Sequence, residues 1–187
     1  MLAVDDVEIA NKLFLVLTLA ANAAVIGLVV LALASRRLLG RVVTALGADA
    51  LGLAWLVAAV ATGGSLFYSE VANFTPCLLC WYQRICMYPL VAVLGVGALR
   101  RDRATRWFAA PFVLVGAPLA LYHWLVERVP ALSDSTSCSA TVPCDVPWFE
   151  EIGYVTLSFM DLSAFLLIAA LLAIDWRADR AHAEPAR

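Results

Sequence analysis

Charged residues are scarce in this chain. They make up only 15% of its 187 residues, and 63% of the residues are hydrophobic, whereas a soluble domain usually carries about 25% charged residues. A soluble globular protein is therefore excluded. The chain also lacks a basic patch, because its 13 basic residues are dispersed over several short segments, and this excludes nucleic-acid binding. Repeats, Gly/Ser linkers and low-complexity tracts are absent as well, which leaves little room for a second, soluble domain.

Five long apolar runs alternate with short polar segments. As helices rising 1.5 Å per residue, these runs are each roughly 27 to 33 Å long, which matches a hydrocarbon core of about 30 Å. The sequence therefore predicts an all-α integral membrane protein embedded in the lipid bilayer of the plasma membrane. The expected spans are Leu13–Ala34, Leu51–Tyr68, Cys80–Leu99, Trp107–Val126 and Val155–Ile174.

The arginines are unevenly distributed between the segments that connect these runs. Short cytoplasmic segments collect Lys and Arg, so the segments after the first, third and fifth runs are expected inside. The N-terminus is then outside and the C-terminus cytoplasmic. A cleaved signal peptide ending at Ala34 is the alternative, but an acidic N-terminus argues against it and cleavage would reverse every later span. The basic residues expected inside are Arg36, Arg37, Arg41, Arg100, Arg101, Arg103, Arg106, Arg177, Arg180 and Arg187.

Two cysteines one helical turn apart, Cys77 and Cys80, begin the third span. Pro76 before them is typical of a helix start. Cysteines at i and i+3 share a helix face, and a helix N-terminus stabilises a thiolate. Arg84 lies on the same stripe, at a depth where an ionisable residue indicates a functional partner. That partner is a thiolate or the negative charge on an electron acceptor; the alternative is that Arg84 snorkels to the headgroups.

A second pair, Cys138 and Cys144, lies in the longest outer segment. The expected topology places both pairs on the outer, oxidising side, where close cysteine pairs suit disulfide chemistry. Two thiol couples in one chain predict a dithiol relay. A zinc site built from all four cysteines and a purely structural disulfide are the alternatives that the pattern leaves open. A fifth cysteine, Cys86, is expected to be a small buried apolar residue.

The third span carries the block Pro-Cys-Leu-Leu-Cys-Trp-Tyr-Gln-Arg-Ile-Cys-Met-Tyr-Pro-Leu, at Pro76–Leu90, and residues 54–70 precede it with Gly63-Gly64-Ser65. These stretches resemble the DsbB family of disulfide-bond-formation proteins, and its BdbC-like branch in particular, over about residues 55–174. The resemblance implies a four-helix membrane bundle that takes electrons from an extracytoplasmic, DsbA/BdbD-like oxidase of thioredoxin fold. It also implies that the electrons pass to a membrane quinone, either ubiquinone or menaquinone.

The resemblance assigns roles to single residues, by their order and location in the family pattern. One cysteine pair exchanges electrons with quinone, an arginine beside it takes part in quinone binding and reduction, and a second cysteine pair in the outer loop exchanges with the oxidase. The matching residues are Cys77 and Cys80 for the quinone-linked pair, Arg84 for the arginine, and Cys138 and Cys144 for the loop pair.

Further polar residues near the outer surface are candidates for the same site. His123 is expected to bind a quinone oxygen, and Glu127 or Asp161 to assist proton supply, because quinone reduction consumes two protons. Tyr88 is expected to line the quinone pocket. The alternatives are an interfacial aromatic belt that includes His123, local pairing of Asp161, and core packing of Tyr88.

We therefore expect three parts: an extra transmembrane helix with a cytoplasmic loop (1–48), the helical bundle (49–176) with an outer redox loop (127–154), and a cytoplasmic tail (177–187). The expected activity is reoxidation of the outer oxidase at the expense of quinone, which generates disulfides de novo. No metal is expected. The competing functions are a transmembrane conduit of reducing equivalents, an epoxide-reductase-like protein and a non-enzymatic scaffold with structural disulfides.

Overall fold

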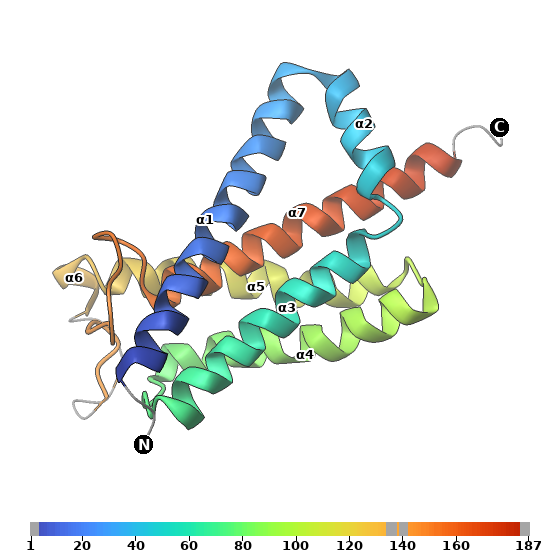
Figure 1. Cartoon of the computed structure of the whole chain (residues 1–187). Helices are drawn as coiled ribbons and strands as arrows, with labels where there is room; N and C mark the ends of the chain where they lie inside the picture. The colour runs from blue at the N-terminus through green and yellow to red at the C-terminus, as the bar shows by residue number, and fades with distance from the viewer. Residues whose placement is uncertain (1–3, 134–137, 139–141, 184–187) are drawn as a thin grey trace.

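A computed structural model describes residues 4–133, 138 and 142–183 of the chain (Figure 1). The described residues form helices and loops, with one isolated bridge between Glu151 and Val155, so the predicted all-α fold is confirmed. Five of the helices are long and apolar enough to cross a membrane. The elements are α1 (Val4–Ala34), α2 (Arg36–Leu46), α3 (Ala50–Leu66), the π-helical turn η1 (Phe67–Val71), α4 (Leu78–Arg100), α5 (Thr105–Val126), α6 (Pro130–Ser133) and α7 (Leu157–Ala183).

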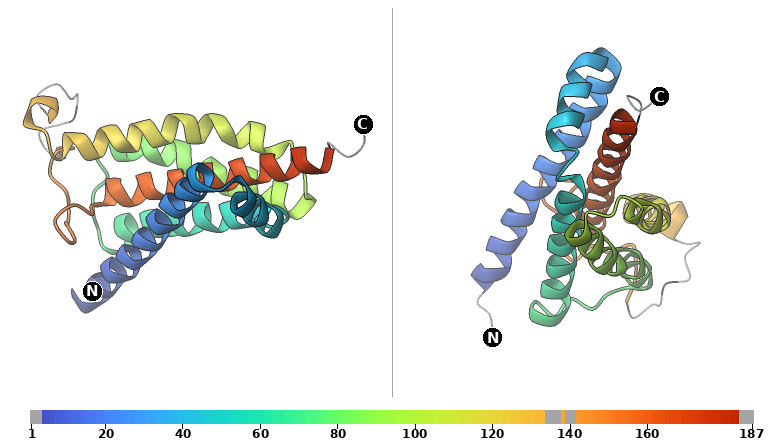
Figure 2. Two further views of the ribbon diagram at one scale, coloured as in Figure 1. Left: turned by 90° about the horizontal axis from the view of Figure 1, so that it is seen from above. Right: turned by 90° about the vertical axis from the view of Figure 1, so that its right-hand side faces the viewer.

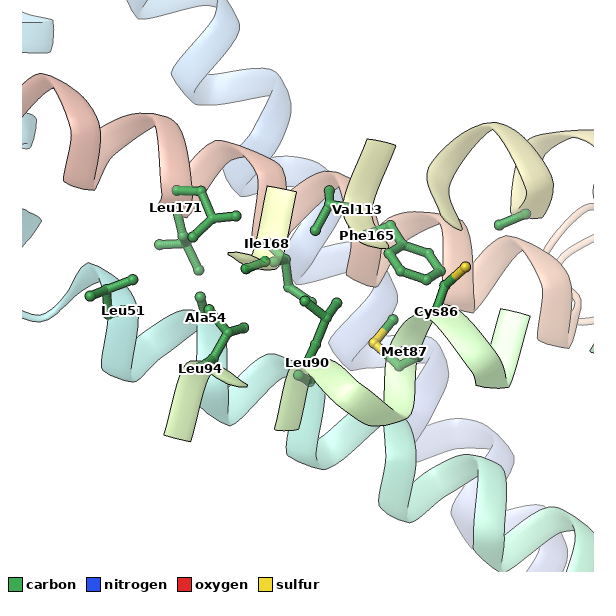
Figure 3. Close-up of a cluster of buried hydrophobic side chains, with 14 of the residues drawn as sticks. Leu51, Ala54, Cys86, Met87, Leu90, Leu94, Val113, Phe165, Ile168 and Leu171 are labelled. Atoms are coloured by element: carbon green, nitrogen blue, oxygen red, sulfur yellow. The ribbon is translucent and has the colours of Figure 1, made fainter. Parts of the chain in front are cut away.

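Four helices, α3, α4, α5 and α7, form a bundle in which each packs against its two neighbours in that cyclic order (Figure 2). Large apolar side chains fill the interior (Figure 3). Cys86 is one of these core residues, with 7% of its surface exposed, which confirms that it is a small buried residue. Phe165 at the centre packs onto α5 where Gly116 allows close approach, because a Cβ at that position would collide with its ring.

Helix α1 lies outside the four-helix bundle and packs mainly along α7 (Figures 1 and 2). It starts at Val4 rather than at the predicted Leu13, because its first turns are polar and escape a hydropathy criterion. Lys12 and Glu8 form an i, i+4 ion pair in these turns, a pairing that supports helix. The predicted number of spans is nevertheless confirmed.

The segment that follows α1, expected as a loop, contains the amphipathic helix α2. Ser35 interrupts the helical run and caps α2, since its Oγ accepts a hydrogen bond from the backbone N–H of Leu38 at 3.4 Å. Val43 is buried on the inner face of α2, and Gly47 just beyond it packs closely against Ala178 of α7. The arginines of α2 lie on its exposed face.

Helix α7 continues beyond the predicted end of the fifth span at Ile174, as far as Ala183. Its additional turns carry Asp175 and Asp179, which meet arginines from the start of α5. Arg106 donates to Asp175 at 3.0 Å and to Asp179 at 2.5 Å, and Arg103 donates to Asp179 at 3.0 Å. We call the end of the bundle that carries this cluster the arginine end.

The opposite end of the bundle carries the N-terminus of α4, the C-terminus of α5 and the segment between α5 and α7 (Figures 1 and 2). Cys77 immediately precedes α4, and Cys138 and Cys144 lie in the segment after α6. All four cysteines of the predicted relay therefore lie at the same end. We call it the cysteine end.

Candidate redox site

Cys77 occupies the N-cap position of α4, as the sequence predicts for a pair that begins this helix. Its backbone is extended, and its Sγ accepts a hydrogen bond from the N–H of Cys80 at 3.3 Å. The cysteine thus takes the place of the usual Ser or Asp cap. The two sulfurs lie 2.8 Å apart as free thiols. They are close enough to exchange a proton, and a small movement would bring them to disulfide distance.

The surroundings of Cys77 favour its thiolate. The Cys80 thiol lies within hydrogen-bonding distance of its Sγ, and the Nε2 atom of His123 lies 3.6 Å away on another side. Hydrogen bonding from Cys80, followed by the contact with His123, lowers the pKa of Cys77 well below its usual range, although burial acts in the opposite direction. These contacts favour Cys77 as a nucleophile and as a leaving group.

His123 connects Cys77 to a buried carboxyl group at the end of α5. Its Nε2 lies 3.9 Å from Oε1 of Glu127, and only 4% of the His123 surface is exposed. The hydroxyls of Thr156 and Ser158 donate to Oε2 of Glu127 at 2.6 and 2.8 Å. Burial raises the pKa of Glu127, and these hydrogen bonds partly oppose the shift. The arrangement provides a proton acceptor on the side of Cys77 that faces α5.

The second cysteine pair forms a disulfide, with the Cα atoms of Cys138 and Cys144 5.9 Å apart. Cys144 is 3% exposed and belongs to the same cluster of buried side chains as Cys77 and Val126. The bundle end therefore brings the two predicted couples into one packed cluster. The disulfide also takes two sulfurs away from a zinc site of four cysteines. The Cys77, Cys80 and His123 side chains still have ligand atoms within 4.8 Å of one another, as a metal-binding set requires.

An apolar cavity of about 430 Å³ lies on the other side of the Cys77–Cys80 pair, enclosed by α1, α3, α4 and α7. Most of its lining is aliphatic or aromatic. Of the two thiols, Cys80 lines the cavity and Cys77 does not; His123 and Glu127 do not line it either. The polar and ionisable side chains in its lining include Ser65, Gln83, Arg84, Tyr88 and Asp161.

Arg84 is held in the cavity wall by α3. Its Nε donates to Oγ of Ser65 at 3.0 Å and its Nη2 donates to the Ser65 carbonyl at 3.0 Å. The hydroxyl of Tyr88 donates to Oγ of Ser65 at 3.2 Å, and the rings of Trp81 and Tyr88 flank the guanidinium at 5.2 and 5.9 Å. No carboxylate among the described residues pairs with Arg84. Its charge is thus fixed toward α3 and the cavity and is left available to an anionic or carbonyl group.

Two buried polar atoms in the cavity lining have no hydrogen-bond partner among the described residues. They are Nε2 of Gln83 and Oδ2 of Asp161. Buried polar atoms are normally hydrogen-bonded, so such exceptions in a cavity indicate a place for a ligand or water. Sequence reasoning did not single out Gln83 or Ser65. Gln83 could have been found as a polar residue within an apolar span.

An aromatic stack covers the cavity at the cysteine end. The ring of Phe74 stacks on Trp148 at 4.7 Å with an interplanar angle of 5°, and on Tyr68 at 5.6 Å with an angle of 17°. Phe149 packs beside Tyr68 at 5.4 Å. The stack joins the segment before Cys77 to the segment after the disulfide. Tyr68, Phe74 and Trp148 of this stack line the cavity.

A membrane bundle with a packed dithiol, a disulfide and an apolar cavity defines a class of thiol–disulfide proteins of the lipid bilayer. The family model described as "Disulfide bond formation protein DsbB" matches residues 47–174. The chain belongs to the DsbB family. It is a multi-pass membrane protein of disulfide formation, similar to the BdbC-like branch.

Individual relatives agree with this assignment. Disulfide bond formation protein C of Bacillus subtilis is 39% identical over 120 residues, which cover 64% of this chain and 87% of that protein. A probable disulfide formation protein of Oceanobacillus iheyensis is 44% identical over 123 residues, which cover 64% and 83%. One of Coxiella burnetii is 39% identical over 130 residues, which cover 66% and 88%. No solved structure matches the chain.

Proposed function

We propose that this protein is a quinone-dependent oxidoreductase that reoxidises an extracytoplasmic oxidase of thioredoxin fold. The observation that carries the proposal is the asymmetry of the Cys77–Cys80 pair. Cys77 packs with Cys144 and contacts His123, whereas Cys80 lines the lipid-side cavity next to Arg84. One couple thus borders both a protein disulfide and a cavity suited to a lipid-soluble oxidant, as a relay between the two requires.

Electrons enter at the loop disulfide. A thiolate of the reduced partner attacks Sγ of Cys138 and Cys144 leaves; the second partner thiol then attacks the mixed disulfide and releases Cys138. The partner becomes a disulfide and the loop a dithiol, so two electrons have moved. We assign the first attack to Cys138 because Cys144 is buried against the bundle.

The loop dithiol then reduces the Cys77–Cys80 disulfide. Cys144, packed in the cluster with Cys77, attacks that sulfur and releases Cys80 as a thiolate beside Arg84. Cys138 attacks Cys144, re-forms the loop disulfide and releases Cys77. The low pKa of Cys77 suits it to be this leaving group, since thiols of lower pKa leave faster.

The cavity fits a quinone by the chemistry of its walls. A bound quinone supplies an oxidant that takes up two electrons and two protons, and the aliphatic lining would hold its tail. Arg84 and the amide of Gln83 are the donors that would bind the ring oxygens, and Tyr88, whose hydroxyl donates to Ser65, would line the site beside them. His123 faces Cys77 and not the cavity, so we propose that it accepts the proton of the Cys77 thiol. Asp161, whose Oδ2 has no partner, is the candidate proton donor inside the cavity.

The required direction of electron flow also favours a quinone. A strongly oxidising thioredoxin-like partner can have a potential near about −120 mV, and each 30 mV corresponds to about 1.4 kcal/mol for two electrons. A glutathione-like pool is too reducing to reoxidise such a partner. We further propose that the cysteine end faces outward, because the arginine end carries the residues that favour the cytoplasm. A conduit from cytoplasmic thiols would need a cysteine at the arginine end, and none of the five is there.

The test compares the number of thiols oxidised with the number of quinones reduced. The purified protein is placed in oxygen-free vesicles with ubiquinone or menaquinone and a reduced thioredoxin-fold dithiol, and both thiol loss and quinone absorbance are followed. We expect one quinone reduced per disulfide formed, and only a stoichiometric burst in vesicles without quinone. Oxidation that continues unchanged without quinone would overturn the proposal.

A trapping experiment tests the order of exchange. Offered the oxidised partner, Cys144→Ser should accumulate a mixed disulfide between Cys138 and the partner. The Cys138 thiolate attacks the partner disulfide and releases the second partner thiol, and Cys144, which would displace the partner by closing the loop disulfide, is missing. Cys138→Ser is the matched control and should accumulate much less. The adducts are identified by mass spectrometry. An adduct that forms mainly on Cys144 would reverse the assignment of the two loop sulfurs.

A further inference from the structure

Helix α1 has no role in the family pattern, because the family match begins at residue 47. It nevertheless contributes to the cavity that Cys80 and Arg84 line. The α1 residues that face the cavity include Phe14, Leu17, Thr18 and Ala21, which recur at helical spacing on one side of the helix. A helix that served only as an additional membrane anchor would not need to meet the redox site.

Two hydrogen bonds join α1 to the bundle, at two different heights along the helix. The hydroxyl of Tyr68 donates to Oδ1 of Asn11 at 2.8 Å, and Nδ2 of Asn22 donates to Oγ of Ser163 in α7 at 2.9 Å. Hydrogen bonds between helices within the apolar phase stabilise and orient membrane helices. Eleven residues of helix separate the two asparagines, or about 16 Å along its axis. Most of the cavity-facing residues of α1 lie between these two contacts, and Ala24 lies just beyond Asn22.

Phe14 makes the close contact between α1 and α3. Its ring occupies the space that a Cβ on Gly64 would need, and its centroid lies 5.8 Å from the ring of Tyr68. Gly64 directly precedes Ser65, the residue that holds Arg84. Through the contact of Phe14 with Gly64, α1 packs next to the residue that holds Arg84.

Farther along, α1 leaves the bundle. The large side chains of Ile26, Val29 and Val30 are exposed, and Leu56 and Val60 of α3 are exposed on the facing side. The cavity lining extends to Ala24, Leu56 and Val60. The cavity is thus covered by α1 near the cysteine end and bordered by lipid-exposed side chains beyond it.

We propose that α1 is the lipid-side wall of the quinone cavity and that its residues between Asn11 and Asn22 determine how tightly the membrane oxidant binds. This inference rests on the proposed function. Arg84 would hold the ring of a bound quinone, and the cavity-facing residues of α1, with Leu56 and Val60 of α3, would hold its apolar part. The specificity-determining surface is therefore outside the segment shared with the family.

The matched variants Ala21→Phe and Ala23→Phe test the proposal in the full-length protein. Both add the same ring to α1, but Ala21 lines the cavity whereas Ala23 is exposed and does not line it. We expect Ala21→Phe to raise KM and Kd for short-chain ubiquinone about tenfold, which corresponds to about 1.4 kcal/mol, because the added ring overfills the cavity. Ala23→Phe should change them less than about twofold. Both variants should keep the stoichiometric burst with the dithiol partner, which uses only the cysteines. Equal quinone constants for the two variants would overturn the role of α1.

Photolabelling of the unmodified protein gives a second test that needs no substitution. An azido derivative of ubiquinone should label the tryptic peptide Leu13–Arg36 of α1, and the label should be displaced by unmodified ubiquinone. The internal control is peptide Trp107–Arg128 from α5, a helix that contributes no residue to the cavity lining. Label on α4 without label on α1 would overturn the inference and leave the proposed function intact. Wild-type protein whose activity does not depend on quinone would instead overturn the proposed function.

Discussion

Arg106 at the arginine end and Arg84 at the cysteine end have different kinds of partners. At the arginine end, Arg106 meets two carboxylates, and the Asp175 carboxylate is almost fully buried beside it. At the cysteine end, Arg84 is held by a hydroxyl and a carbonyl, with no carboxylate among the described residues. The nearby Gln83 and Asp161 leave polar atoms without partners. An arginine paired with carboxylates indicates a contact that stabilises the bundle, whereas an arginine without a carboxylate beside a cavity indicates a place that binds and reacts.

The same contrast applies to the cysteines. Cys86 lies in the apolar core among Phe165, Met87 and other large side chains. Cys77 and Cys80 lie only a few residues earlier, yet they face a helix N-terminus, a histidine and a cavity. Reactivity in this chain is set by surroundings rather than by residue type.

The largest effect is expected when a thiol at the cysteine end is removed. Cys80→Ser should lower quinone-dependent dithiol oxidation by about a thousandfold or more, because the sulfur that borders the cavity is lost. Cys86→Ala is the matched control from the same helix. It should leave turnover within about twofold and change only thermal stability, by about 1 kcal/mol. Equal losses of turnover would show that the core thiol takes part in the relay.

The arginines of the two ends should respond in different measurements. Arg84→Met should raise KM for quinone about 10- to 100-fold, since hydrogen bonds from a charged donor contribute about 1.5–3 kcal/mol, and should hardly alter unfolding. Arg106→Met should lower the free energy of unfolding by about 3–5 kcal/mol, because Asp175 stays buried without its partner, and should leave KM unchanged. Unfolding is followed by circular dichroism in detergent. If the two effects were exchanged, the distinction between the ends would be wrong.

A smaller effect is expected at His123, and it should depend on pH. Because Cys80 and His123 lower the pKa of Cys77, its alkylation rate should fall only at acidic pH, well below the pH at which an ordinary thiol loses its reactivity. His123→Ala removes one cause of this low pKa, so the pKa should rise and the fall in rate should begin at higher pH. Iodoacetamide labelling of Cys77, counted by mass spectrometry, measures both profiles. Superimposable profiles would remove His123 from the control of this thiol.

The smallest effect is expected at Glu127. Glu127→Gln keeps an oxygen that accepts from Thr156 and Ser158, so turnover should stay within about threefold. Glu127→Leu removes the acceptor of two buried hydroxyls and should lower the free energy of unfolding by about 1–3 kcal/mol. Because burial raises the pKa of Glu127, its charge is present only at higher pH, and the Gln variant should differ most from wild type there. A larger difference at low pH would contradict this sign.

The sequence predicts the number of spans, their order and the residues of the thiol block, because these depend on local hydropathy and spacing. It does not predict where two helices touch. Ser65 as the partner of Arg84 depends on the pairing of α3 with α4, and Asp175 as the partner of Arg106 depends on α5 with α7. The extra turns of α7 were missed for the same reason, since ion pairs with another helix support them.

The sequence also does not predict which way the side chain of His123 points. Its place near the outer end of α5 was predicted, but a single sequence does not say which side of the dithiol it faces. In the fold it contacts Cys77, and the cavity is lined from the other side by α1. Arg84 and Tyr88 line this cavity and remain proposed contacts of the quinone, whereas His123, which does not line it, is proposed to act on the Cys77 thiol.

The stack of Phe74 on Trp148 limits how far the loop disulfide can move. Four residues of chain connect Trp148 to Cys144, and fully extended chain spans at most about 3.3–3.6 Å per residue, so Cys144 can travel no farther than about 14 Å from this stack. The loop is therefore a short tether and not a long arm. Under the proposed function, the partner would therefore have to bring its dithiol to the loop, and a partner whose thiols are held back by a bulky neighbouring domain would be out of reach.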